Sequence, residues 1–246
     1  MIYVTGDTLG EYERLIEDKT IVNMTKDDYL IICGNFGFIR SDKDTITGIV
    51  ENEILDALEQ LPYTILFVDG VEENFELLNA YPIEIWNGGK IHRIRKNIAH
   101  LMRGQVFVID GKKIFTMGGG RPGRLDDYVS EMKNETSPAM PTKTELEEGW
   151  ENLRKHNFNV DMIITYTSTG KAIAGNTIHK DRTLYAGDLL PFFERLIEEV
   201  SYKKWYFGLT NTDVSQGFEQ SPSGQYCKEK KMCPVWLKVL KFEFEE

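Results

Sequence analysis

Residues 64–74, T-I-L-F-V-D-G-V-E-E-N, constrain the fold more than any other stretch. A run of β-branched, aliphatic and aromatic residues is followed by an acidic loop with a glycine, which predicts a buried strand that ends in a site loop. The same form recurs at residues 2–10, 29–37, 162–168 and 205–213. Rigid strands position the loops that follow them, so we predict that these loops together form the functional face.

Predicted helices alternate with the strands in the first third of the chain. Apolar residues recur at three- and four-residue spacing from Ile46 to Leu61, which predicts an amphipathic helix that Pro62 ends. Helical composition or periodicity is also found at residues 11–18, 145–156 and 186–200.

The middle of the chain is predicted to be antiparallel. Asn87-Gly88 and Asp110-Gly111 each separate two runs that resemble strands. Such turns are strong hairpin signals, because both turn residues must adopt positive φ. Residues 235–244 alternate like an edge strand.

Length and composition indicate one large globular domain, because a chain of 246 residues can bury a substantial core without dividing. No segment approaches the roughly 18 consecutive apolar residues of a membrane span, and the first residues enter a strand without signal-peptide features. Three cysteines without a zinc-binding pattern indicate free thiols. We predict a cytoplasmic protein without membrane partners, and a net charge of −10 argues against nucleic-acid partners.

Short motifs with glycines follow the predicted strands. They are Gly6-Asp7-Thr8-Leu9-Gly10, Gly34-Asn35-Phe36-Gly37, Gly70-Val71-Glu72-Glu73-Asn74, Thr165-Tyr166-Thr167 and Gly208-Leu209-Thr210-Asn211. In order and form they resemble the motifs of the calcineurin-like metallophosphoesterases: Asp-X-His, Gly-Asp, Gly-Asn-His-Glu, a lone His, and Gly-His-X-His. The resemblance covers Ile2 to about Asp213 and implies an α/β fold, a four-layer α/β/β/α sandwich of two mixed sheets flanked by helices.

In that family, two Asp, one Asn and five His supply a two-metal centre and its catalytic acid. The resemblance places these positions at Asp7, Leu9, Asn35, Val71, Glu72, Tyr166, Leu209 and Asn211. Only Asp7 keeps the family's residue, so these positions are interpreted as a vestigial active-site cleft. The four histidines, His92, His100, His156 and His179, lie outside the motifs and are each expected to be surface or hairpin residues.

The substitutions remove the chemistry that two metals need. Two divalent cations about 3.5–4 Å apart need ligand charge between them, and Asn35 carries none. Leu9 and Leu209 offer no lone pair, and the phenol of a tyrosine must lose a proton before it binds a metal. We therefore predict that two-metal hydrolysis has been lost and that no cofactor is bound.

Two other ligand sites remain open. Asp7, Asn35, Glu72 and Asn211 are oxygen donors that could hold a single Mg²⁺ or Ca²⁺, although hydrogen bonds from loop amides explain such residues more simply. Residues 118–124, G-G-G-R-P-G-R, could bind an anion through backbone amides with Arg121 and Arg124, or could be a loop that follows a hairpin.

Two functions fit these observations. The first is a pseudoenzyme, a catalytically degenerate phosphoesterase that binds a protein or a small phosphorylated ligand through its former cleft or surface. The second is an enzyme with an altered single-metal or metal-free site that acts on a phosphorylated substrate.

Overall fold

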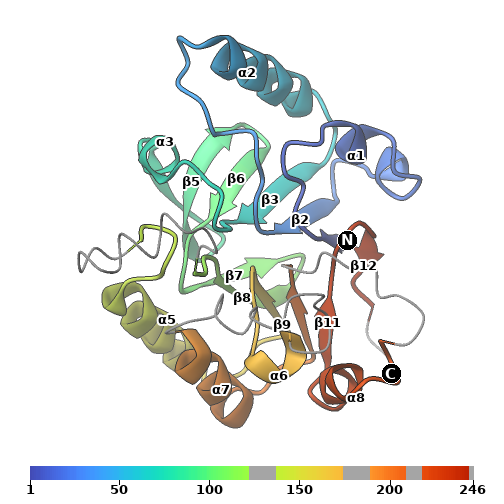
Figure 1. The fold of residues 1–246 in the computed structure, drawn as a ribbon, viewed down its shortest axis with the longest axis vertical. Coiled ribbons are helices and arrows are strands. Elements are labelled where there is room, and N and C mark those ends of the chain that lie inside the picture. The colour runs from blue at the N-terminus through green and yellow to red at the C-terminus, as the bar shows by residue number, and fades with distance from the viewer. Residues whose placement is uncertain (122–136, 174–188, 209–217, 244–246) are drawn as a thin grey trace.

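The computed structural model describes residues 1–121, 137–173, 189–208 and 218–243, and its core is two mixed β-sheets (Figure 1). The first sheet has seven strands in the order β12-β1-β2-β3-β6-β5-β4. Their bounds are β1 Ile2–Thr5, β2 Tyr29–Cys33, β3 Thr64–Val68, β4 Ile83–Trp86, β5 Gly89–Arg95, β6 Ile98–Leu101 and β12 Leu240–Lys241. Strands β1, β2, β3 and β6 are parallel neighbours, and β12, β5 and β4 are antiparallel additions.

The second sheet has five strands in the order β11-β10-β9-β8-β7. Their bounds are β7 Gln105–Ile109, β8 Lys112–Met117, β9 Met162–Thr165, β10 Lys204–Phe207 and β11 Met232–Pro234. All neighbours pair in parallel except β7 and β8, which form a hairpin. The five strands predicted to precede site loops are therefore β1, β2 and β3 of one sheet and β9 and β10 of the other.

Three buried clusters show how the layers pack. Along β2, Leu30 and Ile32 face a cluster shared with helices on the outer side of the first sheet, whereas Ile31 and Cys33 face a cluster shared with the second sheet. This alternation follows from the two-residue period of a strand buried on both faces. A third cluster joins the outer face of the second sheet to its own helices. The two sheets thus pack face to face with helices outside them.

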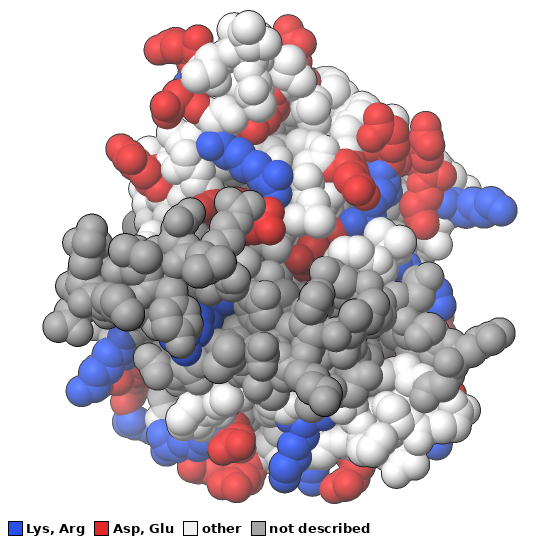
Figure 2. Space-filling model, in the orientation of Figure 1, with Lys and Arg blue, Asp and Glu red and all other residues white. Residues whose placement is uncertain are grey.

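Helices α1 (Glu13–Ile16), α2 (Ile46–Glu59) and α3 (Phe75–Asn79) contribute to the cluster on the outer face of the first sheet. The second sheet's outer cluster includes residues of α5 (Lys143–Lys155), α6 (Gly170–Ile173), α7 (Leu189–Glu199) and α8 (Pro222–Glu229). Helix α5 begins with a capping box in which Thr142 and Glu145 exchange hydrogen bonds. In the view of Figure 2, Asp and Glu side chains gather over α1 and α2.

Both predicted hairpins are confirmed, and their turn residues have positive φ, 48° at Asn87 and at Asp110. The predicted C-terminal strand is wrong in extent, because only Leu240–Lys241 pairs with β1. The amide of Val235 instead bonds to Phe207 of the second sheet, and the carbonyl of Trp236 bonds to Gly6 beside the first. Because residues 235–236 bond to both sheets, this part of the chain cannot pair continuously with one neighbouring strand. No helix in the described ranges is long and apolar enough to cross a membrane.

Candidate functional site

The loops that follow β1, β2 and β9 meet at the side chain of Asn35. Its Nδ2 donates to Asp7 Oδ2 at 2.9 Å and to the Tyr166 hydroxyl at 3.2 Å. Its Oδ1 accepts a hydrogen bond from the backbone N–H of Glu72 at 3.0 Å. Asp7, Asn35 and Tyr166 are all buried. One amide therefore joins loops from both sheets, and three of the positions interpreted as a vestigial cleft lie in contact.

The backbone around Asn35 is as tightly fixed as the side chain. Asn35 has φ 34° and Leu9 has φ 53°, both in the left-handed region that asparagine adopts more readily than most residues. The Leu9 N–H donates to the Asn35 carbonyl at 2.8 Å, which joins the first two loops directly. Leu9 itself is half-buried at this turn. A backbone hydrogen bond therefore holds the two loops together.

Two of the motif glycines are required by close contacts at the site. A Cβ at Gly34 would lie 2.1 Å from a ring carbon of Tyr166, and a Cβ at Gly70 would lie 2.0 Å from Asn35 Oδ1. Such distances are far inside van der Waals contact, so larger residues would displace Tyr166 and Asn35. The packing around Tyr166 and Asn35 therefore requires glycine at positions 34 and 70.

The side chains of Glu72 and Val71 are not among the contacts of Asn35 in the described part of the chain. The Glu72 carboxylate is 47% exposed and lies 3.4 Å from Arg40 Nη2, so only its backbone reaches Asn35. Val71 is half-buried in the same loop. Leu209, Asn211 and Arg124 lie outside the described residues, so the anion site proposed for Arg121 and Arg124 stays a prediction.

No group of three or more His, Cys, Asp or Glu side chains within the described ranges is arranged to hold a metal ion. Asp7 Oδ2 accepts a hydrogen bond from Asn35, and the Asn35 oxygen accepts one from a backbone amide. These two residues therefore interact with protein donors where the single-cation hypothesis needs oxygen ligands. That hypothesis also needs Asn211, which the structure does not describe.

Two buried hydroxyls follow Tyr166. Thr167 Oγ1 and Ser168 Oγ have no hydrogen-bond partner in the described part of the chain, and both residues are fully buried. Buried polar groups in folded proteins are normally paired, so these hydroxyls are candidates for contact with a ligand. The loop that follows β9 therefore carries two buried hydroxyls directly after the Tyr166 phenol.

A second buried cluster adjoins the first and was not predicted. Asp69, the residue before Gly70, accepts from Arg103 Nε at 2.9 Å and Nη2 at 2.6 Å through Oδ2. Its Oδ1 lies 3.1 Å from His100 Nε2, and His100 Nδ1 lies 3.0 Å from His92 Nδ1. We call Asp69, His92, His100 and Arg103 the Asp69 cluster.

The Asp69 cluster connects the two halves of the fold. Arg103 also donates to the carbonyls of Pro138 and Ala139, and it lies 3.5 Å from Glu145 in α5. The backbone carbonyl of Asp69 accepts from Gly119, just beyond β8. The Asp69 cluster therefore ties the end of central strand β3 to the second sheet and its helix layer.

Charge pairing determines the protonation of this cluster. Burial alone would raise the pKa of Asp69, but the Arg103 guanidinium and the His100 imidazole outweigh it and hold that pKa well below its usual range. Burial, together with the nearby His100, lowers the pKa of His92 to about 4. His92 is therefore neutral at neutral pH, and Asp69 is charged.

Glu73 lies between the two clusters. Its Oε1 accepts from the backbone N–H of Phe36 at 2.7 Å, which fixes the loop that carries Asn35. Burial raises the pKa of Glu73 to about 7, and the negative charge of Asp69 adds to the rise. The hydrogen bonds from the backbone amides of Phe36 and Gly37 do not offset the lost hydration. Glu73 thus titrates near neutral pH.

One sign of these residues was visible in the sequence. Asp69 and Glu73 stand in the acidic loop of residues 64–74, and an aspartate at the end of an apolar central strand needs a buried partner. His92 and His100 lie on the hairpin strands β5 and β6, as expected, and their side chains are buried.

The chain matches no model of a known protein family and shows no significant similarity to a curated protein sequence. The geometry at Asn35 therefore carries the functional proposal.

Proposed function

We propose that this chain is a catalytically degenerate relative of the calcineurin-like metallophosphoesterases that works as a binding protein through its former cleft. The observation that supports this most is the contact of Asn35 Nδ2 with Asp7 Oδ2. A two-metal site needs an anionic bridge at this point, whereas Asn35 presents hydrogen-bond donors to the one remaining carboxylate. The amide replaces the cation as the partner of Asp7.

The charges of the cleft favour a protein partner over a phosphorylated small molecule. In residues 6–10, 34–37 and 69–74, each charged side chain is a carboxylate. Arg14 approaches from the backbone side and donates to the Asp7 carbonyl. The Asp7 carboxylate would repel a phosphate, and the hydroxyls of Thr167 and Ser168 can accept hydrogen bonds from a neutral or cationic donor. A lysine, arginine or backbone amide of a partner protein meets these requirements.

Metal content and hydrolysis test the proposal together. Protein purified without chelator should carry no stoichiometric manganese, iron or zinc, and with added manganese it should not hydrolyse phosphomonoesters or phosphodiesters above background. About two transition metals per chain, or turnover within the usual range of about 1–10³ per second, would contradict the proposal.

Restoring the family's residues provides the positive control. If the motif frames are intact, the combined variant should bind two metals while each single reversion should not, because one ligand cannot hold a dinuclear centre. The combined variant carries Leu9→His, Asn35→Asp, Val71→Asn, Glu72→His, Tyr166→His, Leu209→His and Asn211→His. The single-cation hypothesis predicts instead that Mg²⁺ or Ca²⁺ raises the melting temperature of the unmodified protein, and that Asp7→Ala abolishes this rise.

A further inference from the structure

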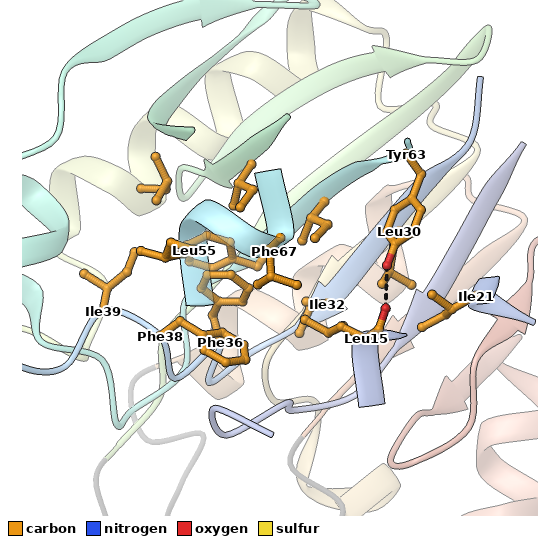
Figure 3. Close-up of a cluster of buried hydrophobic side chains, with 14 of the residues drawn as sticks. Leu15, Ile21, Leu30, Ile32, Phe36, Phe38, Ile39, Leu55, Tyr63 and Phe67 are labelled. Atoms are coloured by element: carbon orange, nitrogen blue, oxygen red, sulfur yellow. Dashed lines mark hydrogen bonds between the residues drawn. The ribbon is translucent and has the colours of Figure 1, made fainter. Parts of the chain in front are cut away.

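A second recess lies on the outer side of the first sheet. A cavity of about 240 Å³ opens between α2 and the segment that joins α3 to β4. Its apolar walls come from Phe38, Ile39, Leu55, Leu77 and Tyr81. Figure 3 shows Phe38, Ile39 and Leu55 at one end of the buried cluster, with Ile21 and Tyr63 at the other. None of the residues assigned to the cleft lines this cavity.

The polar groups of the cavity are already engaged within the protein. The buried Glu51 carboxylate accepts from the amides of Arg40 and Ser41 at 2.9 and 3.0 Å. Asn52 donates to the Gly48 carbonyl at 3.0 Å and accepts from Arg95 Nη2 at 3.1 Å. These bonds fix the walls, so the cavity is preformed and presents mainly apolar contacts to an occupant.

The size of the cavity indicates what it holds. Sites for whole small molecules usually measure about 300–1,000 Å³. A cavity of about 240 Å³ is smaller than that range. It has room for one bulky side chain, the kind of anchor that dominates binding energy at protein interfaces.

Exposed apolar residues continue from both walls of the cavity. Ile49 is 50% exposed and stands three residues before Asn52, which places both on one face of α2. Ile83 directly follows Pro82 of the cavity lining and is 59% exposed. Together with the cavity, these side chains extend the apolar surface that a partner could cover. We call the cavity with Ile49 and Ile83 the α2–β4 surface.

The surroundings of the α2–β4 surface are acidic. Asp42, Asp44, Glu53 and Glu76 are exposed, and no ion pair holds any of them in the described part of the chain. Lys43 adds one positive charge at the cavity. Figure 2 shows uncharged surface over α2 bordered by Asp and Glu side chains. A negative border attracts cationic groups and repels nucleic acid and anionic lipid.

We propose that the α2–β4 surface binds a basic peptide segment of a partner protein, with one aromatic or large aliphatic side chain in the cavity and lysine or arginine beside it. The size of the cavity determines which peptide side chain can enter it, and the exposed carboxylates favour lysine or arginine at the adjacent peptide positions. This inference goes beyond the cleft and does not depend on the loss of metal chemistry there, because an active enzyme could carry the same surface.

Three fluorescein-labelled peptides test the proposal by fluorescence anisotropy. Gly-Lys-Lys-Trp-Lys-Lys-Gly should bind at least about tenfold more tightly than Gly-Lys-Lys-Ala-Lys-Lys-Gly, because only the tryptophan fills the cavity. Gly-Glu-Glu-Trp-Glu-Glu-Gly should not bind, and added salt should lower the affinity of the basic tryptophan peptide. Equal affinity of the tryptophan and alanine peptides, or no binding by the tryptophan peptide at about 1 mM, would overturn the proposal.

Surface variants locate the binding. Ala80→Trp fills the mouth of the cavity from an exposed position and should lower the affinity for the tryptophan peptide about tenfold or more. Ile83→Asp, also at an exposed position, should lower this affinity too. Val22→Asp is the matched control, because Val22 is 59% exposed next to Ile21 at the far end of the buried cluster. It should leave the affinity unchanged.

Two results would reassign the surface and overturn the proposal. If the protein forms dimers that Ala80→Trp abolishes, a second copy of the chain occupies the cavity. If Asp7→Ala abolishes peptide binding and Ala80→Trp does not, the peptide binds in the cleft, which would support the proposed function while contradicting this inference.

Discussion

The cleft and the Asp69 cluster are adjacent, yet each holds its buried carboxylate differently. Asp7 accepts from the neutral amide of Asn35, whereas Asp69 accepts from a guanidinium through two nitrogens and contacts an imidazole. A hydrogen bond to a charged group contributes about 1.5–3 kcal/mol to stability, and removing one partner of a buried ion pair costs about 3–5 kcal/mol. The fold therefore depends more on the Asp69 cluster than on the contact between Asn35 and Asp7.

Removing Asp69 should cause the largest loss. Asp69→Ala leaves the Arg103 guanidinium buried without its carboxylate, and we expect about 3–5 kcal/mol of destabilisation in urea unfolding. Asp56→Ala is the matched control, because its pair with Arg95 is exposed and should contribute less than about 1 kcal/mol. Equal losses for the two variants would remove the distinction between the clusters.

A double variant tests whether the loss comes from the unpaired charge. Asp69→Ala combined with Arg103→Met removes both charges, so it should cost less than the sum of the two single variants. Additive losses would show that Asp69 and Arg103 act independently, and that the contact between them is not the reason for the stability of the cluster.

The strands, the long helices and the two hairpins were predictable because each depends on local sequence. Buried strands show apolar runs, α2 shows helical periodicity, and the turns at Asn87 and Asp110 need residues that accept positive φ. Helix α1 was predicted too long, since only Glu13–Ile16 is helical. The extent of the C-terminal strand could not be predicted from local sequence either, because residues near Val235 bond to both sheets.

The meeting of Asp7, Asn35 and Tyr166 follows from the order of the motifs, which the sequence displays. The Asp69 cluster depends instead on pairing between residues 31 to 34 positions apart, and no local pattern connects Asp69 with His100 or Arg103. The orientation of Glu72 toward Arg40 was equally hidden, because a loop sequence does not show which way a carboxylate points. The contacts between side chains of different loops are therefore what the sequence does not reveal.

The pH dependence of stability should reveal Glu73, which links the two clusters. Its pKa of about 7 in the folded protein lies above the ordinary glutamate value of 4.5 that it has in an unfolded chain. Folding therefore favours the protonated acid, so its stabilisation is complete below about pH 4 and is lost as pH rises to about 7. At 1.36 kcal/mol per pKa unit, the loss is about 3 kcal/mol.

Glu73→Gln cannot titrate, so the free energy of unfolding of this variant relative to the unmodified protein should rise by about 3 kcal/mol between pH 4 and pH 8. His92 acts in the opposite direction, because its lowered pKa removes stability as pH falls below about 6.5. Both proteins contain His92, so the difference between them isolates Glu73. Parallel pH profiles would show that Glu73 is not held in a raised-pKa environment.

Returning one carboxylate to the cleft should have a smaller effect. Asn35→Asp places a second acid against Asp7, where the amide now donates at 2.9 Å. Like charges at this distance raise one pKa, and we expect about 2 kcal/mol of destabilisation at pH 7 that acid reverses. Millimolar manganese should not restore stability, because the other ligands are still absent.

The exchanged pair Asp7→Asn with Asn35→Asp keeps one carboxylate and one amide, and it should recover most of that loss. This variant shows whether the stability loss of Asn35→Asp comes from charge repulsion or from the positions of the two side chains. If the exchanged pair were as unstable as Asn35→Asp alone, the position of the groups would matter more than their charge.

The smallest effect is expected from Tyr166→Phe, and its comparison with Tyr166→Ala distinguishes the contribution of the hydroxyl from that of the ring. The hydroxyl accepts from Asn35 Nδ2 at 3.2 Å, whereas the ring fills the space that Gly34 leaves open. Tyr166→Phe removes one neutral hydrogen bond and should cost about 0.5–1.5 kcal/mol, measured by urea unfolding. Tyr166→Ala also removes a buried aromatic ring and should cost about 3–5 kcal/mol. If Tyr166→Phe were as damaging as Tyr166→Ala, the hydroxyl would carry far more than a neutral bond, and the cleft would resemble the Asp69 cluster in its energetics. A loss near 1 kcal/mol would instead show that the fold can exchange the hydroxyl of Tyr166 at low cost while it depends on the ring, as the proposed binding function requires.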